Sequence, residues 1–104
     1  MSNRRFAKQH ATDLNQPEII LALNEIGCTC YEMEQPVDLL VEYRSIWIVL
    51  EVKNPKGKNK LTKEQEIFFE LTQAPAYVVR NPLEAVTAVV RTWNEVYERL
   101  TSDD

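Results

Sequence analysis

The run 46–52, IWIVLEV, constrains the fold more than any other feature of this chain. Side chains alternate between the two faces of a strand, so Trp47 and Val49 would share one face. The other face would carry Ile46, Ile48, Leu50 and Val52. A strand that is apolar on both faces is typical of the centre of a sheet covered on both sides. The pattern therefore predicts a central strand between layers of helix.

The flanking patterns predict the element order α, β, β, β, α, β, α. A helix is expected over 15–26, with Pro17 in its first turn and Gly27 after its end. A short strand at 28–33 and a hairpin of 37–43 with 46–53 follow. A capping box, TKEQ, starts a helix at 62, with its core face formed by Ile67, Phe68 and Leu71. A strand, AYVVR, and a long helix beginning at NPLE complete the chain. The fold class is therefore α/β.

The length and composition describe one globular domain. We expect residues 11–104 to form it, preceded by a flexible basic arm at residues 1–10. No apolar run is long enough to cross a membrane, and no secretory signal follows the basic start, so a soluble cytoplasmic protein is expected. Cys28 and Cys30 would close almost no loop as a disulfide. Because His10 is the only histidine, we expect buried free thiols instead of a zinc site.

Basic residues are concentrated despite the net charge of −4. Eight of the twelve lie in two short stretches: Arg4, Arg5 and Lys8, and then Lys53, Lys56, Lys58, Lys60 and Lys63. Local potential attracts a polyanion more than total charge does, so the clusters favour a nucleic-acid partner. The alternative is a solvated loop that its lysines keep soluble.

Three charged side chains should meet at one end of the predicted hairpin. Asp38 begins one strand, and Glu51 and Lys53 end its antiparallel partner. Buried carboxylates are costly unless they are paired or bind a metal, and two converging carboxylates suit Mg²⁺. A lysine beside the metal could orient a water or stabilise charge on a phosphate. The structural alternative is a Glu51–Lys53 ion pair with Asp38 capping a turn.

Four segments resemble the PD-(D/E)XK nuclease superfamily, and more narrowly its virus-type replication-repair nuclease (VRR-NUC) branch, known from stand-alone phage proteins. They are PVDLLV, IVLEVKNPKG, LTKEQEIFFE and APAYVVRNPLEAV, within residues 17–89. The resemblance implies a restriction-endonuclease-like αβββαβα core, with a mixed sheet flanked by helices. It also implies metal-dependent hydrolysis of DNA phosphodiester bonds. One difference from the family is that Val37 separates Pro36 from Asp38, where proline usually precedes the aspartate directly.

The resemblance also implies roles for single residues. Asp38 and Glu51 match the metal-binding acids, with the Val52 carbonyl as a further ligand. Lys53 matches the catalytic lysine. The implied cofactor is Mg²⁺ or Mn²⁺, with no organic cofactor.

Two further matches have a second explanation. Glu18 matches an acid that such nucleases add from the first helix, but it also suits the positive end of the helix dipole. Gln65 matches a catalytic glutamine, but it is also the back-bonding member of the capping box.

Three functions follow from these features. The first is a DNA endonuclease whose basic residues contact phosphates; such contacts read no sequence, so structure-selective cutting of flaps or junctions is expected. A homodimer, with Trp93, Tyr97 or the apolar strands in its interface, would supply two active sites.

The second possible function is a non-enzymatic nucleic-acid-binding module that keeps the nuclease fold. This alternative predicts a broken acid set. The third, a protein-interaction adaptor using the last helix, leaves the acids unexplained.

Overall fold

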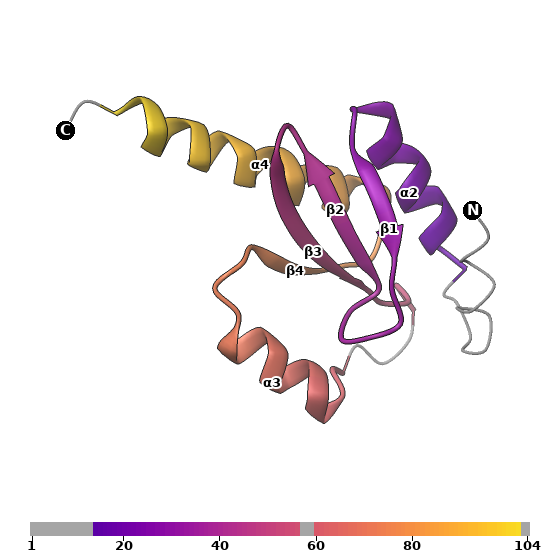
Figure 1. Ribbon diagram of the computed structural model, residues 1–104. Helices are drawn as coiled ribbons and strands as arrows, with labels where there is room; N and C mark the ends of the chain where they lie inside the picture. Colours follow the sequence, from indigo (N-terminus) through magenta and orange to yellow (C-terminus); the bar gives the residue numbers. More distant parts are fainter. Residues whose placement is uncertain (1–13, 57–59, 103–104) are drawn as a thin grey trace.

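The computed structural model describes residues 14–56 and 60–102, and the predicted order of elements is confirmed there (Figure 1). The proposed arm at residues 1–10 and Lys58 lie outside the described residues. The elements are α2 (Gln16–Glu25), β1 (Thr29–Glu32), β2 (Leu39–Tyr43), β3 (Ile46–Val52), α3 (Lys63–Leu71), β4 (Ala76–Val79) and α4 (Pro82–Thr101).

The four strands form one mixed sheet in the order β1-β2-β3-β4. β2 pairs antiparallel with both β1 and β3, whereas β4 runs parallel to β3. β3 therefore has a neighbour on each side, as its apolar sequence predicted. The parallel pairing aligns the ends of β3 and β4, where Lys53 N–H donates to the Val79 carbonyl at 3.0 Å.

The β2–β3 hairpin closes through two residues that both have positive φ. Tyr43 pairs with Ile46, and Arg44 and Ser45 between them have φ of 51° and 76°. A two-residue turn of this kind matches the twist of the strands but normally uses Asn and Gly. Here the Arg44 guanidinium lies 4.9 Å from the centre of the Trp93 ring, so the turn is joined to α4 by a cation–π contact.

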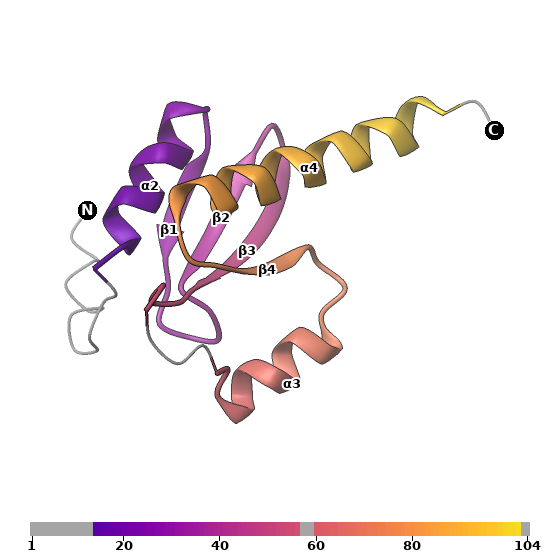
Figure 2. The same cartoon turned by 180° about the vertical axis from the view of Figure 1, so that it is seen from behind.

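The hydrophobic core lies between the sheet and two helices, α2 and α4. In Figure 2 both helices lie in front of the sheet. α2 contributes Ile19 and Leu23, and α4 contributes Ala85 and Val89, all completely buried. The strands contribute the side chains that alternate toward this side: Leu39, Val41, Tyr43, Ile48, Leu50, Val52 and Val79.

Both cysteines are free thiols, as expected from their spacing. Cys28 is buried beneath α2 and Cys30 is half-buried on β1. Burial raises the pKa of the Cys28 thiol to about 11. Burial, with the neighbouring Cys28 and Glu32 as smaller causes, raises the pKa of Cys30 to about 12. Both groups therefore remain protonated and weakly nucleophilic near neutral pH.

The opposite face of the sheet, called the open face below, is covered only in part: Val49 and Glu51 are 8% and 4% exposed, but the prediction of a second helical layer over Trp47 was wrong. Figure 1 views it from the side away from α4, and none of the helices in residues 14–56 and 60–102 crosses β1, β2 or β3 there. Trp47 is 49% exposed, whereas its neighbour Ile48 is completely buried. The prediction that Ile67 and Leu71 form a core face was wrong, because they are 48% and 73% exposed and α3 has no buried residue.

The physical reason lies in the composition of α3. Its nine residues carry four charges, so burying the helix against the sheet would desolvate side chains that have no partner there. Both views place α3 well away from α2 and α4 (Figures 1 and 2). The helix is stabilised locally by its capping box, which the structure confirms at Thr62 and Gln65.

α4 is twenty residues long and only its first half packs on the sheet. Ala85, Val89 and Thr92 are buried, whereas Tyr97 and Leu100 are 51% and 79% exposed. The last turns project past the sheet in both views (Figures 1 and 2). None of the helices in the described part of the chain is long and apolar enough to cross a membrane.

Candidate active site

The strand register brings the two predicted acids together on the open face. Leu39 pairs with Leu50, so Asp38 and Glu51 occupy the next opposite positions and share a face. Asp38 Oδ2 accepts a hydrogen bond of 2.8 Å from the Val52 N–H. Val37 is 1% exposed and lies with the core, so its side chain takes no part in the site. The predicted convergence of Asp38 with the end of β3 is confirmed.

Lys53 and Glu51 form an ion pair in a shielded position. Lys53 Nζ lies 3.1 Å from Glu51 Oε2, and the two side chains are 15% and 5% exposed. This is the contact that the structural alternative predicted. It satisfies only one oxygen, however: Glu51 Oε1 is buried and has no hydrogen-bond partner in the described structure. A buried, unsatisfied charged oxygen destabilises a fold by about 1–3 kcal/mol or more.

Gln65 joins the capping box of α3 to this lysine. Its Oε1 accepts the Thr62 N–H at 3.0 Å and is also 3.4 Å from Lys53 Nζ. The Gln65 N–H in turn donates to Thr62 Oγ1 at 3.2 Å. Gln65 Oε1 therefore makes both contacts: it closes the capping box of α3 and it lies beside the Lys53 ammonium.

The other predicted residues lie at the surface or outside the described residues. Lys56, Lys60 and Lys63 are exposed along the connection from β3 into α3. Arg4, Arg5, Lys8 and Lys58 are not among the described residues. Glu18 is exposed in the first turn of α2, where the helix dipole explains it.

Sequence reasoning missed Asn15, the residue before α2. It is 7% exposed, and its Nδ2 donates to the carbonyls of Lys53 at 3.1 Å and Arg80 at 2.7 Å. It thereby joins the ends of β3 and β4 beside the acids. Its Oδ1 is buried without a hydrogen-bond partner in the described structure. Asn at a helix start, two residues before a proline, resembles an ordinary cap, yet this side chain makes no cap hydrogen bond.

The oxygen donors of this site fit a hard divalent cation. Glu51 Oε1 needs a partner, and Asp38 supplies a second carboxylate on the same face. The Val52 N–H points to Asp38, and the carbonyl of a strand residue points to the same edge as its N–H. The described residues contain no group of three or more His, Cys, Asp or Glu that could hold a metal. Mg²⁺ is suited to such a site because it binds through one or two carboxylates and retains several waters.

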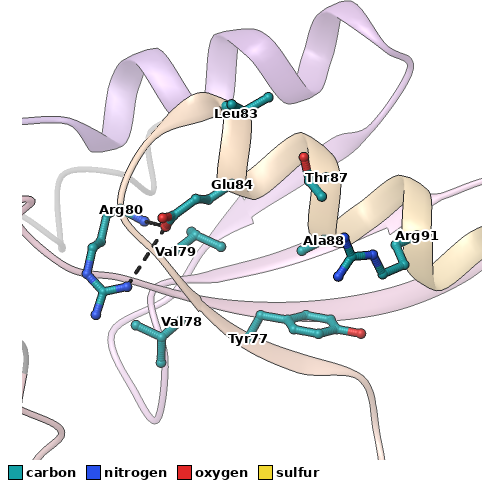
Figure 3. A pocket seen from close by; sticks show the side chains of 9 residues that line it. All are labelled: Tyr77, Val78, Val79, Arg80, Leu83, Glu84, Thr87, Ala88 and Arg91. Carbon is teal, nitrogen blue, oxygen red and sulfur yellow. Dashed lines mark hydrogen bonds and ion pairs between the residues drawn. The ribbon is translucent and has the colours of Figure 1, made fainter.

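A separate pocket of about 390 Å³ lies where β4 meets α4 (Figure 3). Two of the lining residues are already paired: Glu84 Oε1 accepts the Arg80 N–H at 2.8 Å and lies 3.9 Å from its guanidinium. Glu84 thus bonds Arg80 and not the Asn81 N–H that a full capping box requires, although Asn81 does cap Glu84 N–H at 2.8 Å. The lining includes none of the acids Asp38 and Glu51, so this pocket is separate from the candidate active site.

Comparison with known proteins supplies no relative. No protein-family model matches the chain, and no curated protein or solved structure matches it either. The geometry of the open face therefore has to carry the functional conclusion.

Proposed function

We propose that this protein is a Mg²⁺- or Mn²⁺-dependent DNA endonuclease with the restriction-endonuclease-like core of the PD-(D/E)XK superfamily. The observation that carries the proposal is the buried, unpartnered Oε1 of Glu51 beside Lys53, with Asp38 on the same face. A purely structural ion pair gives no reason for a second buried carboxylate oxygen. A bound cation compensates it.

The residues divide the chemistry as follows. Asp38, Glu51 and the Val52 carbonyl would hold the cation, which supplies charge neutralisation for the phosphate and a bound water of lowered pKa. The ion pair with Glu51 would hold the Lys53 ammonium beside the cation, where it would stabilise charge on the phosphate and orient the attacking water. Gln65 restricts the lysine from its other side.

The surroundings of the site support a polyanionic substrate. Lys56, Lys60 and Lys63 are exposed next to the acids along the chain, and Lys58 with the arm residues Arg4, Arg5 and Lys8 would add further phosphate contacts. Contacts of this kind set affinity and register without reading bases, so cutting would be structure-selective. A homodimer would place two such sites on one substrate.

The deciding experiment measures cleavage of labelled single strand, duplex, flap and four-way junction with Mg²⁺, Mn²⁺ or EDTA. Lys53→Ala and Asp38→Asn should each lower the cleavage rate by about 100-fold or more, because Lys53 would stabilise the developing charge and Asp38 would hold the cation. Lys63→Ala, a matched lysine outside the acid cluster, should retain most of the rate and mainly weaken binding. Binding without metal and no cutting of any substrate would favour the non-enzymatic module instead.

A further inference from the structure

An aromatic pair lies on the open face beyond the acids. Tyr31 of β1 and Trp47 of β3 approach across β2, with ring centres 6.1 Å apart and planes tilted by 38°. The register places them on the face of Asp38 and Glu51, because Tyr31 is opposite Leu40, and Leu40 is opposite Val49. The two rings therefore share one surface with the candidate active site.

Both rings leave half of their surface to solvent, at 50% exposed for Tyr31 and 49% for Trp47. Large aromatic side chains usually bury more of their surface, since each can bury about 150–250 Å² in a core or an interface. No helix of the described structure crosses β1 or β3 on this side of the sheet in Figure 1. Rings held side by side on a sheet and open to solvent are the arrangement on which nucleic-acid-binding sheets stack bases.

We propose that Tyr31 and Trp47 form a stacking site for the unpaired bases of a single-stranded segment of the substrate. This inference rests on the proposed nuclease function and narrows its substrate class. Four residues separate Trp47 from Glu51 along β3, which is about 13 Å at 3.3 Å per residue. A single strand lying along β3 would place its bases on the rings while its backbone crosses the acids.

The distribution of charge agrees with this orientation. The exposed lysines Lys56, Lys60 and Lys63 follow the end of β3 that carries the acids, so phosphates are attracted there. At the other end, Glu42 lies directly opposite Trp47 on the same face. A carboxylate repels phosphate, so contact at the ring end has to come from the base faces. Stacking is tolerant of sequence, because every base has a π-face.

The test measures binding of (dT)20 and U20 in EDTA, beside a blunt hairpin duplex, by anisotropy and by fluorescence of Trp47 in a Trp93→Phe background. Binding should quench Trp47. Tyr31→Ala and Trp47→Ala should each weaken single-strand affinity by about tenfold or more and leave duplex affinity unchanged. Tyr97→Ala removes an aromatic ring of equal exposure, 51%, from α4 and should leave both affinities unchanged. Far-UV circular dichroism of each variant identifies any loss of fold.

The outcomes separate this site from the nuclease proposal. Metal-dependent cutting of duplex by the wild type, without Trp47 quenching by either oligonucleotide, overturns the stacking site and keeps the nuclease. Lys53→Ala should lower the cleavage rate by about 100-fold or more but still show full quenching. Equal loss of single-strand and duplex affinity in folded variants overturns the stacking site. Quenching of Trp47 that depends on protein concentration alone also overturns it, because this result identifies a contact between two copies of the chain.

Discussion

The two faces of β3 differ near the hairpin, although the sequence makes both of them apolar; farther along the strand, Val49 and Glu51 on the second face are buried as well. Ile48 and Leu50 are completely buried by α2 and α4, whereas Trp47 on the other face is half exposed. On the open face, the apolar side chains of β3 are followed by Glu51 and Lys53. The helix that follows this strand in the chain, α3, is rich in charge. The comparison teaches that an apolar run shows where burial is possible, and that the neighbouring helices decide where it happens.

The largest expected effect breaks the core face. Leu50→Ala should lower the free energy of unfolding by about 2–5 kcal/mol, because it leaves a cavity under two helices. Leu71→Ala makes the same change on α3, at a residue 73% exposed, and should change it by less than about 0.5 kcal/mol. Urea denaturation measures both. Similar losses in the two variants would mean that α3 packs on the sheet.

The second prediction concerns a ligand on the open face. Mg²⁺ at about a hundred times its dissociation constant should stabilise the wild type by about 2.7 kcal/mol. Glu51→Gln should remove most of this gain, because an amide oxygen is a weaker ligand than a carboxylate. Thermal denaturation with MgCl₂, and with NaCl at equal ionic strength as control, measures the difference. An equal Mg²⁺ effect in both proteins would place the cation elsewhere.

A third prediction sharpens the comparison at the end of the strands. Asn15→Ala should cost about 1–3 kcal/mol of stability, because the carbonyls of Lys53 and Arg80 lose their shared donor. Asn24→Ala, an exposed change in the same helix, should leave stability nearly unchanged. If the two variants unfold at the same urea concentration, the bridge contributes nothing to the fold.

The smallest expected effect lies in the turn that joins β2 to β3. Ser45→Gly should stabilise the protein by about 0.5–1 kcal/mol, because Ser45 has φ of 76° and glycine adopts this region without strain. Thr29→Gly, at an exposed β1 position, should destabilise it by a similar amount. A loss of stability in Ser45→Gly would show that its side chain has contacts worth more than the relieved strain.

Local patterns predicted much of the molecule. Neighbours in sequence determine the element order, the cap at Thr62 and the free cysteines. A single hairpin brings together Asp38, Glu51 and Lys53. Asn15 was missed because its partners lie 38 and 65 residues away. No periodicity encodes such a distance. The catalytic assignment, the cation and the dimer stay predictions.

The sequence by itself determined which segments become helices and strands and which charged residues end the central strand, since these depend on periodicity, capping and alternation within short windows. Only the tertiary structure decided that α2 and α4 cover one face and that Tyr31 and Trp47 on the other remain half exposed. Only it showed that one oxygen of Glu51 has no hydrogen-bond partner among the described residues. Both facts depend on packing between segments that are distant in the sequence. The charged side chains on α3 and the length of each connecting loop determine which elements can pack together.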